Sequence, residues 1–105
     1  MIILPEKFEQ SLRHQLGNEF PEFAASFTDA PPVSIRLHPV KGRDGDYPPV
    51  PWSRWGRYLP ARPVFTLDPL FHAGSFYVQE ASSMFLEQAI TQAIDPGKRL
   101  KVLDL

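Results

Sequence analysis

The chain has 105 residues, of which 43% are apolar and 22% are charged, and its net charge is −1. This length accommodates one small domain, or one such domain and the beginning of another, and the composition is that of a folded globular protein. The absence of cysteine excludes a disulfide, a cysteine-based metal site and a thiolate nucleophile within the chain. No apolar run is long enough to span a bilayer, so we expect a cytoplasmic protein that binds no membrane. The three histidines do not fall into a metal-ligand spacing, so no metal is expected either.

The charge is unevenly distributed along the chain. Residues 1–32 carry a net charge of −3, residues 33–63 carry +4 and residues 64–105 carry −2. The middle third is therefore the candidate surface for an anionic partner. The alternative interpretation is a basic loop region that is merely solvated, and the charge pattern alone leaves both open.

Two amphipathic helices are predicted at the beginning of the chain. A helix over residues 5–16 begins at Pro5 and ends at Gly17, and its apolar stripe has a spacing of four residues. Asn18 is a candidate cap for a second helix, in which Pro21 falls in the first turn. The second stripe contains Phe20, Phe23, Ala24 and Phe27.

The middle of the chain combines strands with proline-rich loops. Residues 33–37 alternate between apolar and polar side chains and predict a strand that ends before Pro39. Nine of the twelve prolines fall between residues 31 and 69, interleaved with aromatic residues, which predicts an ordered loop region. Short strands are expected at "RYL", "VFTL" and "FYVQ", and Asp68-Pro69 predicts a turn or one helical turn.

The end of the chain reads as a helix followed by a buried strand. The helical pattern covers residues 80–94 and ends at Asp95-Pro96-Gly97, and "RLKVLDL" has the apolar density of a strand in a parallel sheet. Such a strand needs a crossover to reach its neighbour, and no residues remain to form one. We therefore expect the chain to be the amino-terminal piece of a longer protein.

Three segments carry a resemblance to a known family. They are "SIRLHPVK", with Ser34, Arg36 and Lys41; "VPW" at residues 50–52; and "FHAGSFYVQEASSM" followed by "VLDL". In this order they resemble the Nop/Sun family of RNA cytosine-5 methyltransferases, in its bacterial ribosomal RNA branch, from about Leu4 to the last residue. His38 stands where that family usually has asparagine.

The resemblance implies a fold and a division into domains. The expected fold class is α+β: a small N-terminal domain of helices and strands with proline-rich loops, followed by the first helix and first strand of a Rossmann-like methyltransferase domain. Residues 1–70 would form the N-terminal, RNA-positioning domain. Residues 71–105 would form the opening segment of the S-adenosylmethionine-dependent domain, which would be incomplete here.

The resemblance also implies an activity and a set of site residues. The full-length protein would methylate C5 of a cytosine in ribosomal RNA with S-adenosylmethionine as cofactor, through two cysteines that this chain lacks, so this span alone is expected to be inactive and to hold no catalytic residue. RNA contact is expected at Arg36, His38, Lys41, Arg54 and Arg57. Support of the cofactor cleft is expected at Gln79, Glu80, Ser82, Ser83 and Asp104.

Each of these roles has a structural alternative. Arg36 and His38 could lie on a half-exposed strand face covered by the proline-rich loop, and the tryptophans beside Arg54 and Arg57 could belong to the core with the arginines at the surface. Asp104 could cap a helix or brace a loop.

The function has an alternative too, which is a free-standing module that binds RNA or a proline-rich peptide without catalysis. If the span folds alone, its unpaired strand and last helix are expected to promote self-association.

Overall fold

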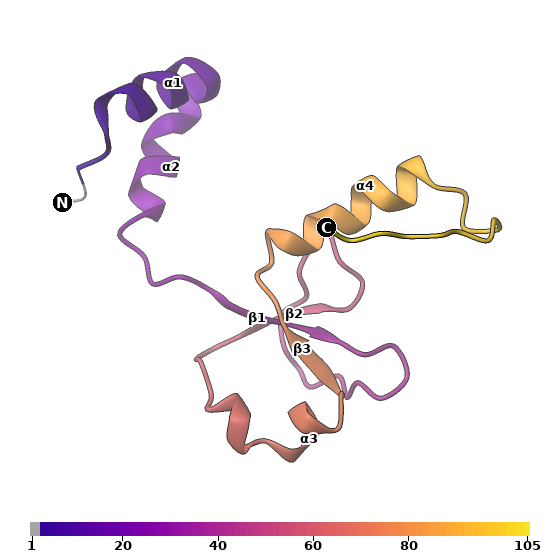
Figure 1. Ribbon diagram of the computed structural model, residues 1–105. Coiled ribbons are helices and arrows are strands. Elements are labelled where there is room, and N and C mark those ends of the chain that lie inside the picture. The colour runs from indigo at the N-terminus through magenta and orange to yellow at the C-terminus, as the bar shows by residue number, and fades with distance from the viewer. Residues whose placement is uncertain (1–2) are drawn as a thin grey trace. The chain divides into compact units, whose positions relative to one another are not determined.

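The structure is a computed structural model that describes residues 3–105, and it combines short helices with one small antiparallel sheet (Figure 1). This mixture confirms the predicted α+β fold class. The chain forms two compact units, of which the first ends at Pro31 and the second is Pro32–Leu105. The predicted boundary after residue 70 falls inside the second unit, and the assignment of residues 71–105 to a methyltransferase domain stays a prediction.

The first unit is a pair of helices. Helix α1 is Glu6–Leu16 and helix α2 is Phe20–Ser26, joined by a single 3₁₀ turn at Gly17–Glu19. Gly17 ends α1 with a φ of 53°, in the left-handed region that glycine adopts without strain, and its amide donates to the carbonyl of Arg13. Both predicted helices are confirmed, but the second begins at Phe20 with Glu19 at the cap position, one residue later than a cap at Asn18 predicts.

The apolar stripe of this first unit is only partly buried. Phe20 is 4% exposed, and the Arg13 guanidinium lies over its ring at 4.1 Å from the centroid. Phe27 is 39% exposed although its ring makes an edge-to-face contact with Phe23. Phe8 in α1 is 45% exposed. Two short helices therefore bury one phenylalanine well and leave the others as partly open apolar surface within the unit.

The second unit is built around a three-stranded antiparallel sheet. Strand β1 (Val33–Leu37) is central and pairs with β2 (Gly56–Leu59) on one side and with β3 (Phe76–Val78) on the other. The predicted strand at residues 33–37 is confirmed, as are the extended segments within "RYL" and "FYVQ". The sheet order β2-β1-β3 pairs residues that are between 20 and 43 positions apart in the sequence.

One face of the sheet packs on a phenylalanine-rich layer. Ile35 and Leu37 of β1 are buried against Phe65, with Phe71 and Phe76 packed around them. Helix α3 (Pro69–His72) lies in this layer, and the carboxylate of its cap Asp68 accepts from the amide of Leu70 at 2.8 Å; this confirms the turn predicted at Asp68-Pro69. Figure 1 shows α3 on the side of the sheet opposite to α4.

The predicted strand at "VFTL" is wrong. Phe65–Leu67 form a 3₁₀ turn in which Phe65 is buried, whereas Val64 and Leu67 are 64% and 79% exposed. The apolar residues of this segment suggested a strand, but among the described residues it pairs with no strand of the sheet.

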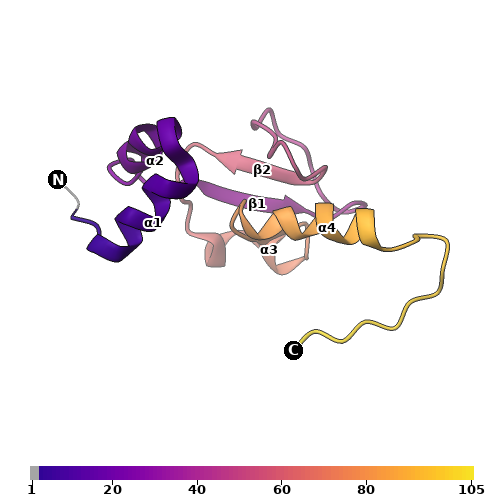
Figure 2. The ribbon, with the colours of Figure 1, turned by 90° about the horizontal axis from the view of Figure 1, so that it is seen from above.

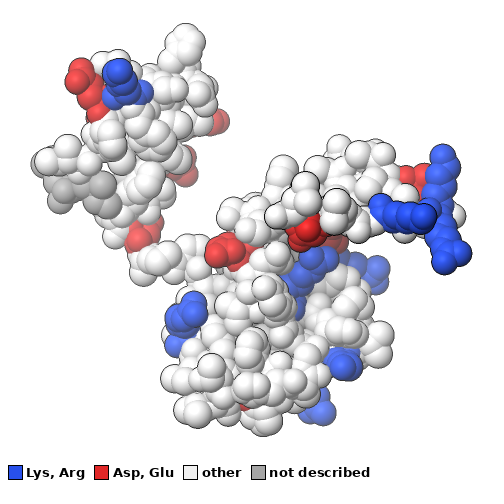
Figure 3. All heavy atoms as spheres, viewed as in Figure 1, with Lys and Arg blue, Asp and Glu red and all other residues white. Residues whose placement is uncertain are grey.

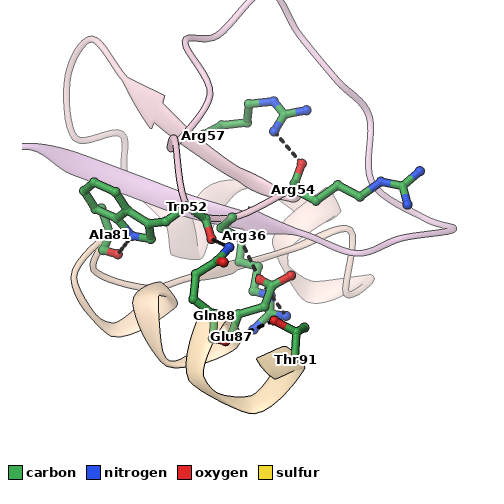
Figure 4. Close-up of polar contacts among 9 residues, drawn as sticks. Arg36, Trp52, Arg54, Arg57, Ala81, Glu87, Gln88 and Thr91 are labelled. Carbon is green, nitrogen blue, oxygen red and sulfur yellow. Dashed lines mark hydrogen bonds and ion pairs between the residues drawn. The ribbon is translucent and has the colours of Figure 1, made fainter. Parts of the chain in front are cut away.

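The opposite face of the sheet packs on a second small core. Val50, Ala81 and Met84 are buried there, with Trp52 and Tyr58 packed against them. Trp52 donates its indole N–H to the carbonyl of Ala81 at 2.6 Å, so the tryptophan is held inside the fold (Figure 4). This layer includes the 3₁₀ turn Ser83–Phe85 and helix α4 (Leu86–Ala93).

The carboxyl-terminal elements differ from the prediction. The helix expected over residues 80–94 is reduced to a 3₁₀ turn followed by α4, and it ends at Ala93 just before Asp95-Pro96-Gly97. The expected strand at "RLKVLDL" is not formed; Figure 2 shows the chain turning after α4 and its last segment running back as an irregular trace. Val102 and Leu103 are 83% and 79% exposed, because a strand requires a partner and none is present in residues 3–105.

Within those same residues, no helix combines the length and the apolar character that crossing a bilayer requires.

Candidate nucleic-acid interface

An arginine and a tyrosine lie side by side where β1 pairs with β3. Arg36 and Tyr77 are register partners, so their side chains emerge on the same face of the sheet. On its other side Arg36 faces Gly56 of β2, which contributes no side chain. Tyr77 is 66% exposed, while its neighbours Phe76 and Val78 point to the opposite face and pack on the core.

The Arg36 side chain is oriented by helix α4. Its Nη2 lies 3.6 Å from Oε2 of Glu87, and the same carboxylate oxygen accepts from the hydroxyl of Ser53 at 3.0 Å (Figure 4). The Arg36 side chain remains 41% exposed. Because the guanidinium carries five N–H groups and Arg36 uses only part of them on Glu87, N–H donors remain for a further acceptor.

An open hollow of about 530 Å³ lies beside this pair. Its lining combines the polar and aromatic side chains at the end of β1 with those around β3, and consists of Arg36, Leu37, His38, Pro39, Phe71, Gly74, Phe76 and Tyr77. The volume falls within the range of about 300–1,000 Å³ that is usual for small-ligand sites.

His38 and Lys41 form the turn that follows β1. Nδ1 of His38 accepts from the backbone amides of Val40 and Lys41, each at 3.1 Å, which places the ring hydrogen on Nε2. Nζ of Lys41 lies 3.4 Å from the carbonyl oxygen of Ala73, and the Lys41 carbonyl accepts from the buried hydroxyl of Ser75. The turn is thereby attached to the loop before β3, so three predicted RNA-contact residues meet at one end of the sheet.

Arg57 has a different environment. Its guanidinium makes two hydrogen bonds to the carboxylate of Asp44, at 2.8 and 2.7 Å. It also donates to the carbonyl of Gly56 and to that of Arg54, the second of which Figure 4 shows. Only 12% of the side chain is exposed. The hydrogen bond from Arg57 lowers the pKa of Asp44, and the same bond raises the pKa of Arg57. Arg57 therefore fastens the proline-rich loop to β2.

Arg54 is exposed, and its guanidinium lies 5.0 Å from the ring centroid of Trp55. Trp52 and Trp55 are half-buried against the two small cores. The tryptophans therefore follow the structural alternative, in which they belong to the core. The structure does not bring Arg54 or Arg57 into the lining of the hollow beside Tyr77.

The residues expected to support a cofactor cleft do not surround a common hollow. Gln79 and Ser83 line a hollow of about 200 Å³ beside α4, and the side-chain oxygen of Gln79 is buried with no hydrogen-bond partner in the described part of the chain. Glu80 accepts from the Ser83 hydroxyl at 3.3 Å. Ser82 is exposed, and Asp104 is exposed in the irregular segment after α4. In the described residues, these side chains therefore do not form a cradle for a cofactor.

Sequence reasoning missed Tyr77 and Glu87. Tyr77 had an available signal, because the alternation in "FYV" places it on the face opposite to Phe76 and Val78. Glu87 had none, since its approach to Arg36 depends on how α4 packs over the sheet.

On the face of the sheet-containing unit that Figure 3 shows, the positive side chains do not form one continuous patch. Figure 3 shows blue side chains dispersed over the sheet-containing unit, with red ones among them near α4. Residues 3–105 also contain no group of three or more histidine and acidic side chains suited to a metal ion. The arrangement is thus suited to a few specific contacts with an anionic partner rather than to broad electrostatic adhesion.

These features define a small α+β domain that presents basic side chains and an exposed aromatic ring at one end of its sheet. Residues 4–81 match the family model for the N-terminal domain of 16S rRNA methyltransferase RsmF. The match covers most of the chain, and the chain belongs to this family. The resemblance found in the sequence is confirmed, and with it the link to ribosomal RNA methylation; methyltransferases of this family typically use S-adenosylmethionine.

Proposed function

We propose that this chain positions ribosomal RNA for a cytosine-5 methyltransferase of the cytoplasm that uses S-adenosylmethionine. The observation that carries the proposal is the grouping of Arg36, His38 and Lys41 at one end of the sheet, in a chain of the RsmF N-terminal domain family. Contacts from basic side chains to phosphates fix the register and orientation of an RNA without reading its sequence.

The chemical step would lie outside this chain. Attack on C6 of a cytosine requires a thiolate, and the sequence has no cysteine. The chain alone is therefore proposed to be inactive, with its contribution confined to holding the RNA. The role of Gln79, Glu80, Ser82, Ser83 and Asp104 as supports of a cofactor cleft stays a prediction.

The five proposed RNA contacts are not equivalent. Arg36 and Lys41 each have donors left over, and Arg54 is exposed, so all three are suited to phosphate contact. The ring of His38 has Nε2–H available outward from the turn. Arg57 would have to give up its bonds to Asp44 to reach a phosphate, so its support is indirect, through the loop that it holds.

The peptide-binding alternative has less support. A groove for a proline-rich peptide needs exposed aromatic side chains. Trp52 is instead half-buried, with its indole N–H bonded to the Ala81 carbonyl, and Gln88 donates to the carbonyl of Trp52.

The proposal is tested by titrating the chain with a labelled fragment of 16S rRNA at several salt concentrations. Binding should weaken as salt rises, and Arg36→Ala should make the dependence of log K on log salt shallower by about 0.7 to 0.9, the contribution of one phosphate contact. Lys7→Ala removes one positive charge from α1 and is the charge-matched control. Absence of salt-dependent binding, or an equal effect of Lys7→Ala, would refute the proposal.

A further inference from the structure

We propose that Tyr77 stacks on an unpaired nucleobase of the bound RNA while Arg36 and Lys41 hold the adjoining phosphates. This inference rests on the proposed function and adds to it a substrate class, because it makes this end of the sheet selective for single-stranded RNA. Tyr77 was not among the residues that the sequence pointed to.

The exposure of Tyr77 is not explained by the fold. It sits at the centre of β3, between two residues that pack on the core, yet 66% of it is exposed. In the described part of the chain its hydroxyl makes no hydrogen bond. Strand β3 holds the backbone of Tyr77 in place, so the aromatic ring offers a flat apolar surface with restricted orientation.

Two basic side chains lie close to the hollow. Arg36 lines it and is the register partner of Tyr77 across β1 and β3. Gly74 also lines it with a φ of 76°, and the atom nearest to the position of a Cβ there is Nζ of Lys41, at 3.8 Å. The Lys41 ammonium therefore lies near the Gly74 part of the hollow, although Lys41 is not one of its lining residues.

The arrangement matches the chemistry of an unpaired nucleotide. An unpaired nucleotide offers a free base face for stacking and a phosphate on each side of its nucleoside, and the hollow is lined by the Tyr77 ring and Arg36, with Lys41 close to its Gly74. Phe71 and Phe76 add apolar surface to the lining. In a duplex both faces of each base are already covered by neighbouring bases, so a duplex could use the cations but not the ring.

The test compares two RNA probes by fluorescence anisotropy. One is a labelled single-stranded RNA of roughly ten nucleotides, and the other is the same strand annealed to its complement. We expect Tyr77→Ala to weaken binding of the single strand about tenfold, with an unchanged dependence on salt and an unchanged affinity for the duplex. Tyr77→Phe should bind like the wild type, because stacking requires the ring and not the hydroxyl.

Tyr47→Ala is the matched control, since Tyr47 is 43% exposed in the proline-rich loop and does not line the hollow. Circular dichroism and the urea midpoint establish that each variant is folded. Unchanged single-strand binding by Tyr77→Ala, or a loss in Tyr77→Phe as large as in Tyr77→Ala, overturns the stacking inference. If Arg36→Ala still weakens binding in that case, the proposed function survives; if the wild type binds neither probe, both fall.

Discussion

Gly56 is the position at which the smallest substitution should have a large effect. It lies in β2, opposite Arg36, and the face that it presents is occupied by the second core. A Cβ placed there would lie 2.6 Å from the sulfur of Met84 and 2.8 Å from Cβ of Val50. Both contacts are closer than real Cβ atoms show, so Gly56→Ala requires the surroundings to move.

The two neighbours differ in how far they can move. The Met84 sulfur lies at the end of a flexible side chain, but Cβ of Val50 moves only with its backbone, and the Val50 amide is bonded to the Gly56 carbonyl at 3.0 Å. Overpacking of this kind costs about 1–3 kcal/mol. Replacing glycine by alanine also lowers the conformational entropy of the unfolded chain, which offsets about 0.4–1 kcal/mol of this cost. We expect a net loss of about 1–2 kcal/mol, which is a large share in a domain stabilised by about 0.05–0.15 kcal/mol per residue.

Urea unfolding followed by tryptophan fluorescence measures this loss, because Trp52 and Trp55 both lie in the same unit as Gly56. Gly45→Ala is the control, since a Cβ there meets only the movable ring of Tyr47. Met84→Ala, combined with Gly56→Ala, should cost less than the sum of the two single changes, because it makes room for the new methyl group. A Gly56→Ala protein with the wild-type midpoint would refute the packing argument.

Three further predictions concern charges and exposed apolar surface. Arg57 lowers the pKa of Asp44, so the pair stabilises the fold fully above the ordinary carboxyl pKa of 3.8, and this contribution is lost as the pH falls through the lowered pKa. Asp44→Asn should therefore flatten the acid side of a plot of urea midpoint against pH. An unchanged plot would contradict the assignment. Glu87→Gln should strengthen single-stranded RNA binding severalfold in anisotropy titrations, because it removes the carboxylate that competes for Arg36; equal or weaker binding would count against Arg36 as a phosphate contact. Leu86 is 63% exposed on α4, so Leu86→Lys should lower the apparent mass of the chain at high concentration in sedimentation velocity, whereas a wild type that is monomeric throughout would refute the predicted self-association.

Local signals predicted the parts of the fold that depend on local chemistry. Gly17 and Asp68 mark helix ends through backbone conformation and capping, and the alternation over residues 33–37 marks the central strand. The two helix ends need few distant contacts, and the strand, although it pairs with distant segments, has an alternation that matches the two faces of the sheet. The sequence therefore indicated them correctly.

The failures come from elements that depend on a partner. The apolar residues of "VFTL" and "RLKVLDL" satisfy the pattern of a strand, but pairing requires a neighbour at the right distance, which a pattern cannot supply. The same reason explains the site. Arg36 could be selected from its strand face, whereas its contact with Glu87 and its closeness to Tyr77 arise from pairings over 40 and more residues.

The turn after β1 can be closed by either a histidine or an asparagine at position 38. Nδ1 of His38 accepts two backbone amides, and Oδ1 of an asparagine occupies nearly the same position relative to its own Cβ and can accept them as well. What the turn demands is thus an acceptor at one point in space, and either residue satisfies it. The two side chains differ in their second polar group: the imidazole extends an N–H beyond the turn, whereas the amide group of asparagine is shorter and does not reach as far. An exchange that is silent for folding would then change only the reach of the side chain toward whatever occupies the hollow.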